Sequence, residues 1–221
     1  MLRRLVDGFI RFLTWLACDI DVEEIDKIPD EGPCIVYMNH VNFLEAPLMI
    51  SRLTHKKVTG IAKEETWDNP IKAFLFNLWK AIPISRGEAD MKALKAALRF
   101  LKSGGMLAIA PEGTRSGDGK LAKAQTGISF IAVKSGSPIF PMACYGHEVI
   151  WKNVVRLKRT PFRINTGPLF EIKFEGKLTH EIRDQITDEI MFQLAELLPQ
   201  EYRGAYSDLS KKTTEYINFL E

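Results

Sequence analysis

The chain has 221 residues, of which 46% are hydrophobic and 26% are charged. This is enough for one sizeable globular domain, too little for two comfortable ones, and unlike a disordered protein. The formal net charge of +2 and the lack of a recognition motif argue against nucleic acid as a partner. The three cysteines lie far apart, which gives no sign of a disulfide framework or a zinc site and favours a reducing compartment.

The N-terminal segment has the pattern of an amphipathic helix. Its apolar residues recur at helical spacing: Leu2, Leu5, Val6, Phe9, Ile10, Leu13 and Leu16, with Phe12 and Trp15 on the flank. Asp7 and Arg11 interrupt this pattern, so we expect neither a signal peptide nor a membrane-spanning helix. Two interpretations stay open, a helix in the membrane interface and a helix packed on its own domain. We assign residues 1–20 to this helix and 21–221 to the main domain.

Strands and helices alternate along the rest of the chain. Apolar runs bounded by turn signals predict strands at 34–38, 58–62, 106–110, 138–145 and 162–166. Helical periodicity predicts helices at 47–53, 70–79, 91–102, 127–135 and 179–198, the third of them capped by Asp90. Alternating strands and helices are typical of an α/β layer architecture.

A histidine and a carboxylate follow the first predicted strand. His40 and Glu45 lie five positions apart, where the chain leaves the strand for a turn or a first helical turn. A carboxylate that accepts the Nδ1–H of a histidine fixes its tautomer and leaves Nε2 free to take a proton. The pair could therefore activate a hydroxyl. The alternative is a structural contact between His40 and Glu45 with no role in catalysis, which would have the same spacing in the sequence.

A second polar cluster follows the predicted strand at 106–110. It consists of Pro111, Glu112, Gly113, Thr114, Arg115 and Ser116. The two clusters together resemble the glycerolipid acyltransferase family, which includes the 1-acylglycerol-3-phosphate acyltransferases. That family has a histidine, four variable residues and an aspartate, and later a Glu-Gly-Thr-Arg block. The second block matches in full, whereas Glu45 stands where the family usually has aspartate.

Two weaker elements extend the resemblance over residues 32–167. The stretch from Lys63 to Pro83-Ile84-Ser85-Arg86 resembles the family motif that contains a lysine and ends in isoleucine-x-arginine. The stretch 137–142 resembles a proline-bracketed apolar motif. The resemblance implies a single α/β domain with a mixed, mostly parallel sheet flanked by helices, preceded by the N-terminal amphipathic helix.

The resemblance also implies a reaction. A fatty acyl group would move from acyl-coenzyme A or an acyl carrier protein to lysophosphatidate, giving phosphatidate, with His40 as general base and Glu45 orienting it. We expect no metal and no cofactor beyond the thioester co-substrate. Transfer would be direct, because the chain has no Gly-x-Ser-x-Gly nucleophile elbow. Glu45 bears on the rate and on acceptor preference, so two alternatives stay open: another lysolipid or lipid alcohol as acceptor, and a catalytically weakened lipid-binding homologue.

Several charged residues are candidate substrate ligands. Arg115 can hold a phosphate through its guanidinium fork, helped by backbone N–H groups of the turn that contains Gly113 and Thr114. Glu112 would repel a phosphate, so we expect it to bind a substrate hydroxyl or to anchor the loop. Lys63 and Arg86 are further candidate phosphate ligands. The alternatives are a salt-bridged turn and solvated charges.

A lipid substrate implies a membrane as partner. We expect a peripheral or monotopic protein on the cytoplasmic face, with the N-terminal helix in the interface. The segment 149–170 has no acidic residue. It contains Lys152, Arg156, Lys158, Arg159 and Arg163, with Trp151 and Phe162 nearby. Such a patch attracts anionic lipid head groups, coenzyme A phosphates or an acidic carrier protein, unless it is only a solvated hairpin face.

The remaining candidates are apolar residues that could line an acyl-binding slot and the three other histidines. An acyl chain needs an apolar slot, and its candidate lining residues are Phe43, Leu44, Leu48, Phe74, Phe76 and Trp79. The other histidines, His55, His147 and His180, are expected to be surface or loop residues.

Overall fold

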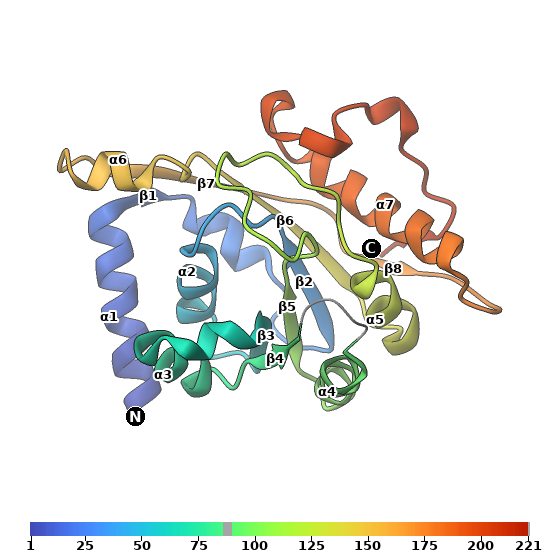
Figure 1. Ribbon diagram of the computed structural model, residues 1–221, viewed down its shortest axis with the longest axis horizontal. Coiled ribbons are helices and arrows are strands. Elements are labelled where there is room, and N and C mark those ends of the chain that lie inside the picture. The colour runs from blue at the N-terminus through green and yellow to red at the C-terminus, as the bar shows by residue number, and fades with distance from the viewer. Residues whose placement is uncertain (86–89, 221) are drawn as a thin grey trace.

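The computed structural model describes residues 1–85 and 90–220 and has a nine-stranded mixed sheet at its centre (Figure 1). The strand order is β1-β7-β6-β2-β5-β3-β4, and β8 and β9 extend the sheet beside β6. The strands are β1 (Cys18–Ile20), β2 (Cys34–Met38), β3 (Val58–Lys63), β4 (Ile82–Ile84), β5 (Met106–Ile109), β6 (Ile139–Tyr145), β7 (Thr160–Thr166), β8 (Phe170–Ile172) and β9 (Ile217–Phe219). The pairs β1–β7, β2–β5, β2–β6, β3–β4 and β3–β5 are parallel, which confirms the mixed, mostly parallel sheet.

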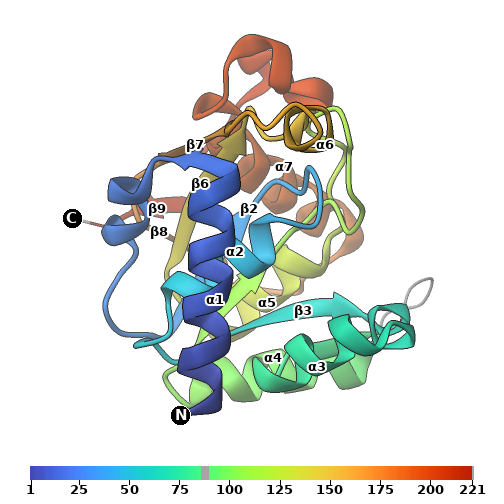
Figure 2. The same cartoon turned by 90° about the vertical axis from the view of Figure 1, so that its left-hand side faces the viewer.

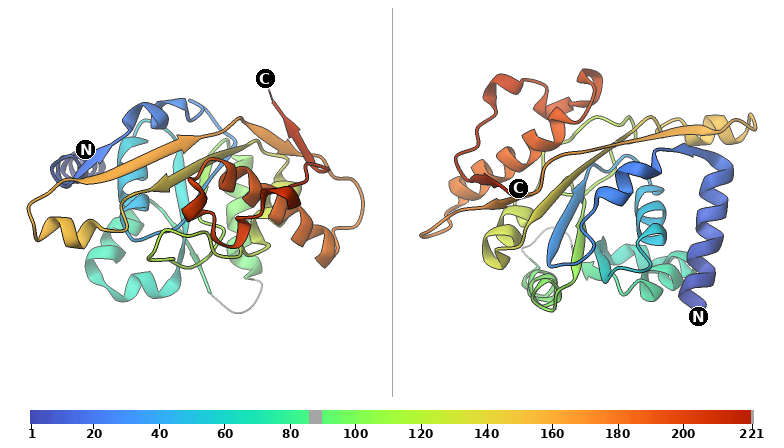
Figure 3. Two further views of the ribbon diagram at one scale, coloured as in Figure 1. Left: turned by 90° about the horizontal axis from the view of Figure 1, so that it is seen from above. Right: turned by 180° about the vertical axis from the view of Figure 1, so that it is seen from behind.

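Helices cover both faces of this sheet. They are α1 (Leu2–Ala17), α2 (Glu45–Arg52), α3 (Pro70–Leu78), α4 (Met91–Lys102), α5 (Gly127–Ser135), α6 (Ile150–Val154) and α7 (His180–Glu196). In Figure 1, α1, α2 and α3 lie on one side of the central strands, and α4, α5 and α7 lie on the other. The views from above and from behind in Figure 3 show the N-terminal helix and the C-terminal segment on opposite sides of the molecule.

The central strand β2 explains why two helical layers are needed. All five of its side chains are buried. Ile35 and Tyr37 belong to one hydrophobic cluster, together with residues of α4, α5 and α7, whereas Val36 and Met38 belong to a second cluster with residues of α2. Successive side chains of a strand point to opposite faces, so a continuous apolar run fits a strand that is covered on both sides.

Helix α1 packs on the domain through a face that combines buried polar residues with Ile10 and Ala17, which contact the hydrophobic core. Asp7 is buried and accepts a hydrogen bond of 3.0 Å from Trp79 Nε1. Thr14 is also buried, and Arg52 Nη2 of α2 donates to its Oγ1 at 3.1 Å. Helix α1 lies at the surface of the molecule (Figure 2). Its exposed apolar residues are Leu2, Leu5, Phe9, Phe12, Leu13, Trp15 and Leu16. The helix therefore packs on its own domain and still presents an apolar face.

Two further observations concern this end of the chain. No helix among the described residues is both long enough and apolar enough to span a bilayer. Strand β1 follows α1 directly and pairs with β7, and the division of the chain at residue 20 stays a prediction.

The predicted elements are confirmed apart from shifts at their ends. Helix α2 begins at Glu45, two residues earlier than the periodicity indicated, so the carboxylate of the first motif lies in the first turn of a helix. Asp90 caps α4 by accepting hydrogen bonds from Lys92 N and Ala93 N. The sequence did not predict β1, β4, β8 or β9, each three residues long, because so short a run shows no clear alternation.

Strand direction brings the two sequence clusters together. Because β2, β3, β5 and β6 are mutually parallel along the sheet, their carboxyl ends lie at one edge. His40 follows β2, Lys63 ends β3, the 111–116 cluster follows β5, and His147 follows β6. Ligands of open α/β sheets bind at this edge.

Candidate active site

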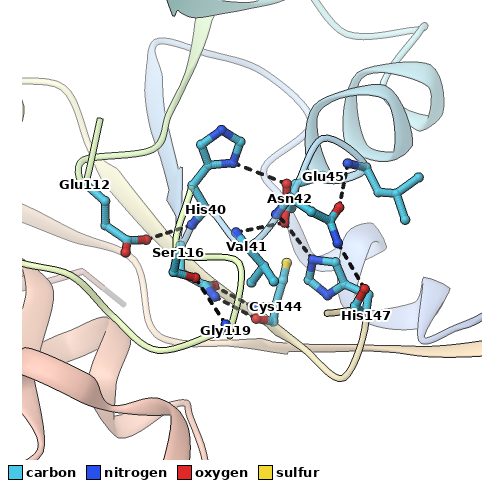
Figure 4. Close-up of polar contacts among 11 residues, drawn as sticks. His40, Val41, Asn42, Glu45, Glu112, Ser116, Gly119, Cys144 and His147 are labelled. Carbon is cyan, nitrogen blue, oxygen red and sulfur yellow. Dashed lines mark hydrogen bonds and ion pairs between the residues drawn. The ribbon is translucent and has the colours of Figure 1, made fainter. Parts of the chain in front are cut away.

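Glu45 and His40 form the centre of the polar cluster at the carboxyl edge of the sheet (Figure 4). His40 Nδ1 lies 3.2 Å from Glu45 Oε2. The other oxygen, Oε1, accepts hydrogen bonds from Val41 N at 2.9 Å and Asn42 N at 2.8 Å. A third contact to Oε1, at 2.6 Å, comes from His147 Nε2. Three donors therefore hold Oε1, and Oε2 is directed at His40.

The charge of Glu45 is stabilised although its side chain is only 2% exposed. Burial on its own would raise the pKa of this carboxyl, but hydrogen bonds from His147 and His40 outweigh it and lower the pKa to about 2. Its position in the first turn of α2 adds the favourable end of the helix dipole. Glu45 is thus a permanent anion beside the imidazole of His40.

Two asparagines fix the turn that carries His40. Asn39 pairs with the backbone of Cys144 in β6: its Oδ1 accepts from Cys144 N at 2.8 Å and its Nδ2 donates to Cys144 O at 2.7 Å. Asn42 Nδ2 donates to His147 O at 2.9 Å. These bonds join the ends of the parallel strands β2 and β6, so the His40 turn is held by the sheet and not only by its own sequence.

His147 corrects an expectation from the sequence. It was predicted to be a surface or loop histidine, and it does follow β6 in a loop, but it is 0% exposed. Its ring stacks on Phe162 with 4.1 Å between ring centroids. Phe162 is itself buried in β7, so it belongs to the core and not to the basic segment with which it was grouped. One signal was available in the sequence: His147 comes two residues after a strand whose end lies at the same edge as that of β2.

Glu112 contacts the other side of the His40 turn. Its Oε1 accepts from His40 N at 2.7 Å, and its Oε2 accepts from Ala122 N at 2.7 Å. Burial raises the pKa of Glu112 to about 7, although both of these hydrogen bonds lower it. Glu112 therefore anchors the loop after β5 to the histidine backbone. Its role toward a substrate hydroxyl stays a prediction.

The loop after Glu112 runs along the His40 turn. Ser116 N donates to His40 O at 2.8 Å, and Gly117 N donates to Val41 O at 3.0 Å. Gly113 begins this loop with φ +67°, a left-handed conformation that favours glycine over other residues. Thr114 and Arg115 follow it and are exposed at the rim of the site.

The candidate phosphate ligands have different surroundings. The Arg115 guanidinium makes no hydrogen bond or ion pair with any residue that the structure describes, so it is not the salt-bridged arginine of the structural alternative. Lys63 is partly exposed at the end of β3. Arg86 lies outside the described residues.

The arrangement suits proton transfer at His40. The side chain of His40 is 29% exposed, and Figure 4 shows Nδ1 facing Glu45 while the other ring nitrogen points away from the cluster. Nε2 can therefore meet a substrate hydroxyl. Within residues 1–85 and 90–220, no group of histidine, cysteine and acidic side chains is arranged to hold a metal ion.

The candidate acyl-lining residues divide into three groups. Leu44, Leu48 and Trp79 are buried in the hydrophobic core that includes α2, so they are packing residues. Phe76 is partly buried against the same core, and Phe43 and Phe74 are exposed. Phe43 lies within the His40 turn and stacks on Trp151 of α6, with 5.5 Å between ring centroids.

Comparisons with known proteins identify a matching family model and similar sequences. A family model described as Acyltransferase matches residues 19–145, more than half of the chain. The chain is 26% identical over 192 residues to 1-acyl-sn-glycerol-3-phosphate acyltransferase BAT2, chloroplastic, of Brassica napus, covering 85% of this chain and 50% of the relative. It is 24% identical over 218 residues to the 1-acyl-sn-glycerol-3-phosphate acyltransferase of Pseudomonas aeruginosa, covering 94% of this chain and 83% of the relative.

A solved structure is similar as well. The crystal structure of the 1-acyl-sn-glycerophosphate (LPA) acyltransferase PlsC from Thermotoga maritima superposes with a TM-score of 0.64 and 25% sequence identity, covering 88% of this chain and 78% of that one. The chain spans about half the length of several curated relatives that it matches. The fold is therefore shared with a protein that is named as an acyltransferase.

Proposed function

Because this chain belongs to the acyltransferase family, we propose that it moves a fatty acyl group from acyl-coenzyme A or an acyl carrier protein to lysophosphatidate. The product would be phosphatidate, a precursor in phospholipid biosynthesis. The observation that carries the proposal is the imidazole of His40, held at Nδ1 by the buried anion Glu45 and open at Nε2. The names of the relatives support lysophosphatidate as the acceptor.

In the proposed reaction, His40 acts as the general base. The acceptor hydroxyl gives its proton to His40 Nε2 as its oxygen attacks the thioester carbonyl carbon. Glu45 stabilises the imidazolium that forms, as the carboxylate of a catalytic triad does. The tetrahedral intermediate then collapses: the C–S bond breaks, and the leaving thiolate takes the proton from His40. One ester C–O bond forms, one thioester C–S bond is lost, and a free thiol is released.

The acceptor phosphate belongs on one side of His40 in this proposal. Strands β5 and β3 lie in succession beside β2, so the loop that carries Gly113, Thr114 and Arg115 lies on the same side as Lys63. The exposed guanidinium of Arg115 suits a bidentate contact with phosphate oxygens. Glu112 holds this loop against the histidine turn, and Arg86 is expected as a third cation.

The exposed face of α1 supports attachment to a membrane. A row of seven large apolar side chains faces outward from this helix, with Arg4 and Arg11 exposed among them. An apolar face flanked by arginines fits a helix that lies in the bilayer interface. We propose that the protein is peripheral or monotopic at the cytoplasmic face of a membrane, where its acceptor is found.

A thiol-release assay tests the proposed function. Acyl-coenzyme A is incubated with and without lysophosphatidate, free thiol is measured, and the lipid product is identified by mass. We expect thiol release that depends on lysophosphatidate, and phosphatidate as the product. His40→Ala should lower kcat by about 100- to 10,000-fold, the usual contribution of a general base. His55→Ala is the matched control, because His55 is exposed in a loop away from the site.

Other outcomes would favour the alternatives. Activity with another lysolipid but not with lysophosphatidate would identify a different acceptor and leave the chemistry intact. Lipid binding without turnover across a panel of lysolipids, with both coenzyme A and carrier-protein donors, would contradict the proposal and favour a lipid-binding homologue.

A further inference from the structure

His147 is a buried polar residue for which the proposed reaction has no explicit use. Its Nε2 lies 2.6 Å from Glu45 Oε1, and its ring packs against Phe162. Its Nδ1 is buried and has no hydrogen-bond partner within the described residues. The proton of this imidazole therefore belongs on Nε2, where it has an acceptor, because a buried N–H at Nδ1 would be left unsatisfied.

We propose that His147 is a positioning residue that fixes the Glu45 carboxylate so that its second oxygen meets His40. This inference rests on the proposed function, since it assigns His147 a role in the proton transfer at His40. It makes the site a chain of three side chains, His147–Glu45–His40, in which only His40 meets the substrate. The two imidazoles lie on different strand ends, β6 and β2, which the sheet holds side by side.

The proposal explains how one carboxylate can serve two histidines. Oε1 is held by Val41 N, Asn42 N and His147 Nε2, and Oε2 is left for His40. Val41 N and Asn42 N belong to the same turn as Glu45, so these two donors move together with the carboxylate. His147 is the donor that ties the carboxylate to another part of the fold. Without it, rotation of the carboxylate would weaken the contact to His40.

The length of the glutamate side chain is part of this argument. Aspartate at position 45 would withdraw the carboxylate by one methylene, and it could not keep both imidazoles within hydrogen-bond distance without a shift of the backbone. His147 and the glutamate should therefore act as a pair. Substitution of His147 should cost less in a Glu45→Asp background than in the wild type, because coupled residues are not additive.

The test compares His147→Phe with His147→Gln. Phenylalanine keeps the aromatic packing but removes the donor, whereas glutamine places an amide N–H near the position of Nε2. We expect His147→Phe to lower kcat by about 10- to 100-fold, the usual effect of losing a hydrogen bond to a charged group, with little change in KM. His147→Gln should restore most of the lost rate.

A second readout does not depend on turnover. Carbon NMR of the Glu45 carboxyl should show it ionised down to the lowest pH at which the wild type is folded. In His147→Phe the pKa of Glu45 should be higher, so that the carboxyl titrates within the pH range in which the protein is folded. His147→Gln should move it back. This result would support the positioning role even if no acceptor is found, so the failure of the proposed function and the failure of this inference are distinguishable.

A packing control completes the design. Phe162→Leu weakens the stacking on His147 but leaves its donor in place, so it should lower Tm with little effect on kcat. The inference is overturned if His147→Phe retains wild-type kcat and carboxyl titration. It is equally overturned if His147→Gln behaves as His147→Phe, because the loss would then come from the imidazole shape and not from the donor.

A second inference rests on a separate surface, which we call the α6 tip and define as residues 151–158. Its backbone is closed by Leu157 N donating to Val154 O and Lys158 N donating to Asn153 O, both at 3.0 Å. Four apolar side chains are nevertheless exposed: Trp151 by 63%, Val154 by 41%, Val155 by 81% and Leu157 by 96%. Leu157 has φ +53°, a conformation that a residue with a Cβ seldom adopts.

We propose that the α6 tip inserts its apolar side chains into an anionic bilayer. In Figure 1 the tip projects outward above α1, at the same side of the molecule. Three exposed cations, Lys152, Arg156 and Lys158, alternate with the apolar residues, and such cations attract anionic head groups. A projecting loop offers little surface for a rigid protein partner, whereas a lipid phase can receive a projecting apolar side chain.

The tip is also connected to the rest of the proposed membrane face. The Arg159 guanidinium lies over the Trp15 ring of α1, 5.9 Å from its centroid, and Trp151 stacks on Phe43 of the histidine turn. Insertion of the tip would therefore place the mouth of the site at the lipid surface, from which an acceptor lipid could enter.

Vesicle binding tests the second inference without any need for turnover. Full-length protein is sedimented with vesicles of phosphatidylcholine alone and with vesicles that contain phosphatidylglycerol. We expect stronger binding to the anionic vesicles, and Val155→Glu with Leu157→Glu should weaken it by about 10-fold or more. Each tip substitution is also made singly, and Met91→Glu is the matched control for these single variants, because it adds one negative charge at an exposed apolar position of α4, on the other side of the sheet (Figure 1).

Unchanged vesicle binding by the tip variants would overturn this second inference. If those variants also lost activity only when the donor is an acyl carrier protein, the tip would instead be a docking site for that acidic protein.

Discussion

Two buried glutamates flank His40, and their environments have opposite effects. Glu45 and Glu112 are 2% and 3% exposed, and burial raises the pKa of both. Glu45 also has hydrogen bonds from two imidazoles and two backbone N–H groups, and its pKa is lowered to about 2. Glu112 has one backbone N–H at each oxygen and a neighbouring anion, Glu45, and its pKa is raised to about 7. The number and charge of the donors, not the depth of burial, separate the two groups.

The difference corresponds to two roles. Glu45 contacts the ring of His40, so its charge acts on the group that takes the proton. Glu112 contacts the backbone of His40 and of Ala122, so it acts on the position of the turn and of the loop. The following changes test this division, beginning with the largest expected effect.

Replacement of Glu45 by Gln should have the largest effect. The change keeps the shape of the side chain but removes the charge that stabilises the imidazolium, and loss of the carboxylate from a catalytic triad lowers kcat by about 10,000-fold. We expect a loss of about 100- to 10,000-fold in kcat, measured by thiol release. Glu112→Gln is the matched control, and an equal loss in both variants would contradict the division of roles.

Replacement of Glu112 by Ala should act mainly on stability. It leaves His40 N and Ala122 N without their acceptor, and each unsatisfied buried donor costs about 1–3 kcal/mol. Chemical denaturation should show a reduced free energy of unfolding, and kcat should fall less than in Glu45→Gln. A variant as stable as the wild type would show that the loop does not depend on this anchor.

The pH dependence of stability should differ between the two glutamates. The pKa of Glu112 is raised from 4.5 in the unfolded chain to about 7, so its contribution is fully present below pH 4.5 and is lost as the pH rises through 7. The pKa of Glu45 is lowered from 4.5 to about 2, so its contribution is present above pH 4.5 and is lost as the pH falls toward 2.

Denaturation curves at several pH values measure this difference. Relative to Glu112→Gln, the wild type should lose stability between pH 4.5 and 8. Relative to Glu45→Gln, it should lose stability between pH 4.5 and the acid limit of folding. Parallel curves in the first comparison would show that Glu112 ionises at its ordinary pKa.

The smallest expected effect is that of Ser116→Ala. Ser116 Oγ accepts a hydrogen bond from Gly119 N at 3.2 Å within the same loop, and such a bond contributes about 0.5–1.5 kcal/mol. Because Glu112 and the backbone bonds from Ser116 N and Gly117 N hold the loop, kcat should stay within about twofold of the wild type. A larger loss would mean that the hydroxyl itself takes part in the reaction.

Local sequence determined much of the fold. Helical and strand periodicity depend only on neighbouring residues, and they located the strands β2, β3, β5, β6 and β7 and most of the helices. The same patterns placed His40 and Glu45 at the end of β2 and Glu112 to Arg115 after β5. Contacts within a few residues, such as that between His40 and Glu45, could be predicted because the backbone itself limits the distance.

Tertiary structure alone decided which distant groups meet. Glu45 and His147 are 102 positions apart, and His40 and Glu112 are 72 positions apart. Their contacts depend on the order of β6, β2 and β5 in the sheet, which periodicity does not specify. The same limit applies to α1. Its spacing defines an apolar stripe, but only the folded molecule shows that Asp7 and Thr14 are buried against Trp79 and Arg52 while most of the stripe faces away from the domain. A hydrogen-bond partner for a buried polar group can come from anywhere in the chain, so only the folded molecule shows it.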